Sequence, residues 1–269
     1  MRDEEGKPLL SALLLLGSFT FGYNLHTFLH ELGHAISIWV QGGTVHGFIL
    51  HPFLASYAPS TYVPDHVLLY LGGALIGGTG TVLFAFLAWR YRSPYLMPLV
   101  MACAAGLLTT SRWMFVAPFT DVFTDYHSLI TLGAPPVVIF LWGLLFLVVG
   151  LTVFILYLPL VGISHRSSLV KHLIVIELGI LPYQVGARLY CILTADADLQ
   201  GAVSRVMYQA VALAILACLS KWLSGRIPFL RSVEMAPIRK THAVVVWAVA
   251  AAFIIGMLLV SIPRDMVVT

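Results

Sequence analysis

Long apolar stretches dominate the chain, and short breaks rich in glycine, proline or charge separate them. A helix needs about 20 mostly apolar residues to cross the hydrocarbon core of a bilayer, and glycine and proline mark the turns between helices. The pattern therefore predicts an all-α, polytopic membrane helix bundle of about six to seven transmembrane helices. The helical segments are expected at residues 9–40, 67–89, 94–111, 128–163, 169–193, 202–223 and 242–262.

The first apolar segment is longer than a bilayer is thick. Thirty-odd helical residues extend for about 50 Å, compared with about 30 Å of hydrocarbon. We therefore expect a break at Gly17, or at Gly22 and Asn24, which would leave a short leading piece before the main helix.

Residues 42–64 are too polar and too rich in proline for a membrane span. Within them, residues 44–51 alternate weakly between polar and apolar side chains and include β-branched residues. We predict a short β-strand or hairpin here, with an exposed edge.

Composition supports an integral, multi-pass membrane protein. Of the 269 residues, 59% are hydrophobic and only 10% are charged, whereas soluble domains are about 25% charged. We expect one membrane-embedded domain over residues 1–269. No basic patch stands on a soluble domain, so a nucleic-acid partner is not expected.

Lysine and arginine concentrate on one side of the predicted bundle, together with the N-terminus. Cytoplasmic loops carry such an excess, so the pattern predicts a cytoplasmic N-terminus. Few basic residues fall elsewhere: Arg112, Arg205 and Arg264 lie on the other side, and Arg188 lies within a span.

The stretch His30-Glu31-Leu32-Gly33-His34 places three ionisable side chains inside an apolar helix. Residues four apart share a helix face, so His30 and His34 can direct ring nitrogens at one Zn²⁺ ion. Glu31 is the expected general base, because its carboxylate can reach water at the metal and take a proton. Ionisable groups at membrane depth are functional by default. His26, one turn earlier, is expected to be hydrogen-bonded to a neighbour instead of binding metal.

Here the sequence resembles the site-2 protease family of intramembrane zinc metalloproteases. The resemblance depends on residues 30–35, on Gly42 and Gly43 before a short extended segment, and on the small-residue run at 71–78. It covers a core of about residues 9–135, with additional helices at about 136–269. It implies a zinc metalloendopeptidase that cleaves a membrane protein or peptide substrate within or beside the lipid bilayer.

The family also implies a third metal ligand, an aspartate at the start of a later core helix that is normally followed by glycine. This chain contains no Asp-Gly pair. Asp125, just before an apolar run, is the first candidate; Asp121 is the next and His127 the third. A free strand edge can bind an unwound substrate by strand addition and so satisfy backbone amides that lipid cannot. The family resemblance implies the same, and Val45 and Phe48 are therefore candidate substrate-binding residues.

Three points stay open. The family runs the histidine-bearing helix into the membrane from outside, whereas the charge pattern here runs it the other way. The polar stripe of Glu177, Gln184 and Arg188 on one helix face suits either structural hydrogen bonds or a water or substrate path. The alternative function is a non-catalytic membrane metal-binding or transport protein that uses the same helix.

Overall fold

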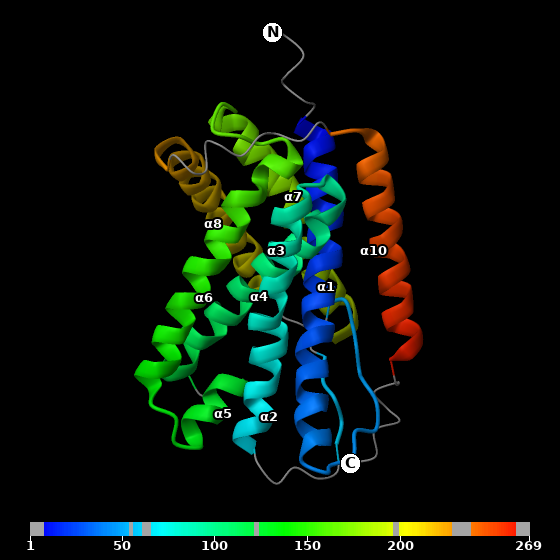
Figure 1. The fold of residues 1–269 in the computed structure, drawn as a ribbon, viewed down its shortest axis with the longest axis vertical. Coiled ribbons are helices and arrows are strands. Elements are labelled where there is room, and N and C mark those ends of the chain that lie inside the picture. The colour runs from blue at the N-terminus through cyan, green and yellow to red at the C-terminus, as the bar shows by residue number, and fades with distance from the viewer. Residues whose placement is uncertain are drawn as a thin grey trace.

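The computed structural model describes residues 8–53, 56–60, 66–120, 124–195, 199–227 and 238–261. Seven helices within these ranges are long and apolar enough to cross a membrane, as the sequence predicts (Figure 1). The architecture is consistent with a multi-pass membrane protein. The spans are Pro8–Val40, His66–Tyr91, Pro94–Phe119, Pro136–Val161, Leu169–Thr194, Leu199–Arg226 and Lys240–Val260.

The first helix, α1 (Pro8–Val40), is continuous and forms the centre of the bundle. It packs against α2 (His66–Gly73), α4 (Met97–Val116), α7 (Leu169–Ala195) and α10 (Lys240–Val260).

The predicted break in α1 is wrong, because its glycines serve close packing. A Cβ on Gly22 would lie 2.5 Å from the backbone nitrogen of Ala102, and one on Gly17 would lie 3.2 Å from the Trp247 ring. Only glycine lets the neighbouring helices approach so closely.

The second span changes its helical form along its length. Helix α2 passes into a π-helical segment, η1 (Ala74–Gly78), then a 3₁₀ turn, η2 (Thr79–Thr81), and finally α3 (Val82–Tyr91). Departures from i→i−4 hydrogen bonding of this kind are frequent at functional sites. Here the irregular segment lies against α1.

The predicted segment at residues 128–163 is divided in the structure. After the 3₁₀ turns η3 (Pro94–Leu96) and η4 (Ala117–Phe119), helix α5 spans Asp125–Thr131 and α6 spans Pro136–Tyr157, followed by η5 (Leu158–Val161). Gly133, with φ of 102°, and Pro135 at the N-cap of α6 separate the two helices. Helix α6 packs on α4, and α7 pairs with α8 (Leu199–Arg226).

The predicted strand at residues 44–51 does not form. Among the described residues, this segment makes only isolated bridges: Val45 with Ser60 and Ile49 with Tyr57 join it to residues 56–60, and Phe48 pairs with Ser261. Val45 and Ile49 are four residues apart, whereas their partners Ser60 and Tyr57 are three residues apart. The first segment therefore contains one extra residue, which interrupts the ladder as in a β-bulge. Gly47, with φ of 146°, lies between the two bridges. The extended segment is present, but a regular strand is not.

The basic residues gather at the end of the bundle where α1 begins. Figure 1 places the end of α3, the end of α8 and the start of α10 at this end. These termini carry Arg90, Arg226 and Lys240. Residues 30–34 lie in the last third of α1, away from the basic end.

Candidate metal centre

Two histidines on α1 direct their rings toward the same point. His30 and His34 are one helical turn apart, and their ring centroids are 4.7 Å apart in an edge-to-face arrangement. Their Nε2 atoms are 3.1 Å apart. The i, i+4 spacing therefore brings both imidazoles together, as the sequence predicts.

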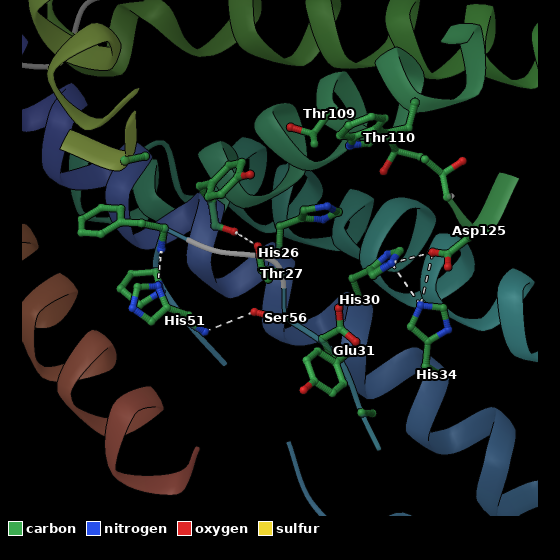
Figure 2. A pocket seen from close by; sticks show the side chains of 18 of the residues that line it. His26, Thr27, His30, Glu31, His34, His51, Ser56, Thr109, Thr110 and Asp125 are labelled. Carbon is green, nitrogen blue, oxygen red and sulfur yellow. Dashed lines mark hydrogen bonds and ion pairs between the residues drawn. The ribbon is translucent and has the colours of Figure 1, made fainter. Parts of the chain in front are cut away.

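Helix α5 supplies a carboxylate to the same point. The Thr124 hydroxyl accepts a hydrogen bond from the His127 backbone N–H and caps α5, which makes Asp125 the first helical residue. Asp125 Oδ2 lies 2.9 Å from His30 Nε2 and 3.3 Å from His34 Nε2. Figure 2 shows the three side chains pointing toward one another.

The charge state of Asp125 suits a metal ligand. Burial disfavours its ionised form, but the hydrogen bonds and positive charge of His30 and His34 outweigh that effect and hold the pKa of Asp125 well below its usual range. The carboxylate is therefore anionic and able to bind a cation.

The separations of the three donor atoms match a tetrahedral metal site. Ligands about 2.0–2.1 Å from a tetrahedral Zn²⁺ ion lie about 3.3 Å from one another. The observed separations are 2.9, 3.1 and 3.3 Å, so shifts of a few tenths of an ångström would admit the ion. Within the described ranges, His30, His34 and Asp125 form the group of His, Cys, Asp and Glu side chains arranged to hold a metal. Two nitrogens and one carboxylate oxygen are a donor set that Zn²⁺ accepts.

Backbone carbonyls of the second span fix the orientation of the histidines. His34 Nδ1 donates to the carbonyl oxygen of Leu69 at 2.8 Å, which orients the ring so that Nε2 faces Asp125. His26 Nδ1 donates to the carbonyl of Gly77, also at 2.8 Å. His26 is buried and hydrogen-bonded, and it lies outside the three-ligand group.

Small residues bring the second span onto this face of α1. Gly72 lies against the backbone of Gly33, and a Cβ on Gly77 would lie 2.9 Å from the Cα of His30. Gly78 instead faces the Phe146 ring of α6. The glycine run at 71–78 therefore packs mainly on the histidine-bearing turn.

Glu31 lies beside the candidate metal ligands in a shared cavity. Its side chain is only 6% exposed and lines a cavity of about 650 Å³ together with His30, His34 and Asp125 (Figure 2). Thr110 and Ser56 also line this cavity. The volume falls within the usual range for ligand pockets, about 300–1,000 Å³.

The other candidate residues lie elsewhere. Asp121 is outside the described residues. His127 directs Nδ1 at the carbonyl of Ala117, 3.4 Å away, and does not join the ligand group. Val45 and Phe48 are not among the residues that line the 650 Å³ cavity. Phe48 also pairs with Ser261, so the backbone near Phe48 is already bridged.

Sequence reasoning missed the two backbone carbonyls that orient His34 and His26. A carbonyl carries no residue signature, so the glycine run was the one indication that backbone would approach α1 closely. Of the polar stripe on α7, for which the sequence left a water or substrate path open, Gln184 and Arg188 line the cavity and Glu177 does not.

No protein-family model, curated protein or solved structure matches this chain. The resemblance to the site-2 protease family therefore depends on the sequence motif, and the function is argued from the geometry of the site.

Proposed function

We propose that this chain is an intramembrane zinc metalloprotease, similar to the site-2 protease family, that hydrolyses peptide bonds of membrane-embedded or juxtamembrane substrates. One observation carries the proposal: three metal-ligating atoms lie within 3.3 Å of one another, and a buried carboxylate lines the same cavity.

His30, His34 and Asp125 would hold the Zn²⁺ ion. When bound, the ion supplies Lewis acidity, which makes a water molecule more acidic and a peptide carbonyl more electrophilic. The hydrogen bond from His34 to Leu69 keeps the ring aimed at the site, as the partners of metal-bound histidines generally do.

Glu31 would act as the general base and then as the general acid. Its carboxylate accepts a proton from the water that attacks the peptide carbonyl carbon. The C–N bond then breaks, and Glu31 returns the proton to the departing amine. One water is consumed, and the products are a carboxylic acid and an amine.

The cavity favours hydrolysis over metal transport. Transporters place binding sites near the bilayer midplane, in discontinuous helices at the interface between structural repeats. Here the ligands come from one turn of α1 and the first residue of α5, near one end of the bundle. The cavity beside them has room for several residues of an unwound peptide.

The test compares Glu31→Gln with Glu177→Gln after reconstitution in proteoliposomes. Glu177 is a matched control, because it is also a carboxylate on a membrane helix and is partly buried. Unlike Glu31, Glu177 does not line either described cavity. Cleavage of a panel of quenched-fluorescent transmembrane peptides is measured beside zinc content. We expect Glu31→Gln to retain zinc and to lose about 10²- to 10⁴-fold in cleavage rate, while Glu177→Gln retains both.

Equal cleavage by wild type and Glu31→Gln would contradict the proposal. Zinc binding without cleavage of any peptide by the wild type would instead favour the non-catalytic metal-binding or transport protein.

A further inference from the structure

Three arginines from three helices line a second, smaller cavity. Its volume is about 170 Å³, and its walls include Arg112 of α4, Arg188 of α7 and Arg205 of α8. Arg112 and Arg205 are exposed and Arg188 is partly buried, so the three guanidinium groups form an accessible pocket of positive charge that attracts an anion.

The described residues supply no carboxylate partner to these arginines. The ion pairs of the described part of the chain join histidines to Asp125, and none involves Arg112, Arg188 or Arg205. The Nε atom of Arg188 is buried and has no hydrogen-bond acceptor. A buried guanidinium nitrogen without a partner is costly, so a ligand that accepts from it would stabilise the site.

Arg188 also lines the 650 Å³ cavity that contains the candidate metal ligands. One side chain thus forms part of the wall of both cavities, and a molecule bound at the metal can extend to the arginines.

The unpaired atoms at the smaller cavity suit a peptide. Gln209 Nε2 donates to Gln184 Oε1 at 3.1 Å, which joins α8 to α7, but Gln209 Oε1 is buried without a donor. The cavity therefore presents a buried donor without a partner, Arg188 Nε, and a buried acceptor without a partner, Gln209 Oε1. An acidic residue of a peptide offers a partner for each atom: its carboxylate can accept from Arg188 Nε, and its backbone N–H can donate to Gln209 Oε1.

We infer that this arginine cavity binds a carboxylate of the substrate peptide and so selects substrates with an acidic group near the cleaved bond. This inference rests on the proposed protease function. The carboxylate is either an aspartate or glutamate side chain or the free carboxyl end of the peptide. Both sources have the chemistry that guanidinium groups bind by charge-assisted hydrogen bonds.

The experiment uses one quenched-fluorescent transmembrane peptide in four forms for each position tested. Glutamate or glutamine is placed in turn at each position near the cleaved bond, each with a free or an amidated carboxyl end. The full-length protein is compared with Arg188→Gln, Arg188→Lys and Arg205→Gln. Arg166→Gln is the matched control, because Arg166 is exposed in the loop at the basic end.

For the wild type, we expect kcat/KM to be about 10- to 100-fold higher for the preferred carboxylate form than for its neutral match. Arg188→Gln and Arg205→Gln should reduce that preference, and both variants should retain wild-type zinc content. Arg188→Lys should retain part of the preference for the carboxylate form, and Arg166→Gln should retain all of that preference. If cleavage depends on glutamate in place of glutamine, the bound carboxylate is the side chain. If cleavage depends on a free in place of an amidated end, the bound carboxylate is the chain end.

A second measurement separates this inference from the protease proposal. Fluorescence anisotropy of the same labelled peptides on the zinc-loaded Glu31→Gln protein reports binding without cleavage. Tighter binding of the carboxylate form, lost in Glu31→Gln/Arg188→Gln, supports the arginine cavity even if no peptide is cleaved.

Equal kcat/KM and equal binding for the charged and neutral forms would overturn the inference, while cleavage itself would leave the protease proposal standing. If phosphatidylglycerol in the vesicles protects wild type but not Arg188→Gln against thermal unfolding, and the peptide forms do not differ, the anion is a lipid headgroup and the inference is wrong.

Discussion

Gly73 lies directly against the ring of His34. A Cβ added at Gly73 would come within 2.7 Å of His34 Nε2 and within 2.6 Å of His30 Cε1. Both are ring atoms that face the candidate metal site, so the absence of a side chain at this position leaves room for both rings to reach the metal.

We predict that Gly73→Ala lowers zinc affinity about 10- to 100-fold, the range seen when the surroundings of metal ligands are disturbed. Competition with a fluorescent zinc chelator measures the affinity. Gly256→Ala in α10 is the control, because a Cβ there meets no atom within 4 Å. Wild-type affinity in Gly73→Ala would show that the two rings do not depend on this close packing.

The third ligand is tested by single substitutions along residues 121–127. Asp125→Asn should lose stoichiometric zinc, because the neutral amide replaces a partly buried anion that lies 2.9 Å from His30. His127→Ala should retain zinc, because its ring is directed at the Ala117 carbonyl. Asp121→Asn should also retain zinc. Zinc content is measured by elemental analysis, and loss in Asp121→Asn with retention in Asp125→Asn would reverse the assignment.

Much of the fold could be predicted from apolar patterning. The seven spans follow from long apolar runs, and the i, i+4 spacing predicts that His30 and His34 share a helix face. Asp125 was the first candidate from its place at a helix start, but no sequence rule brings residue 125 to residue 30. Only the packing of α5 beside α2 does so.

Glycine caused two of the incorrect or incomplete predictions. In α1, Gly22 is a packing position against α4 and does not end the helix. At Gly47, a backbone conformation with φ of 146° accompanies an extra residue that interrupts the expected strand. A sequence cannot distinguish these uses of glycine, because each is decided by the neighbour that approaches it. The arginine cavity could not be predicted either, since its walls come from three separate helices.

The substrate role predicted for Val45 and Phe48 is tested with proline. Proline removes the backbone N–H that a substrate strand would use, so Val45→Pro and Phe48→Pro should reduce cleavage more than zinc binding. Val45→Ala and Phe48→Ala, which retain the N–H, are the matched controls. Equal loss of cleavage and zinc would argue against a role of this segment in substrate binding.

Tyr183 links the segment beside the cavity to two helices. Its hydroxyl donates to the carbonyl of Pro52 and accepts from Asn24 Nδ2, which lies 3.1 Å away. Tyr183→Phe leaves a buried carbonyl and a buried amide without this partner, and we predict a loss of about 1–3 kcal/mol in the free energy of unfolding. Unfolding in detergent measures the change. Tyr91→Phe, whose side chain is 68% exposed, should differ little from wild type. A wild-type value for Tyr183→Phe would show that water replaces the hydroxyl.

The central claim is that His30, His34 and Asp125 hold a zinc ion that Glu31 uses for hydrolysis. The most direct measurement is the zinc content of the purified wild-type, His34→Ala and Glu31→Gln proteins, determined after equal dialysis against a weak chelator. We expect one zinc per chain in wild type and Glu31→Gln and strongly reduced zinc in His34→Ala. Zinc-free wild-type protein, or equal zinc in all three proteins, would contradict it.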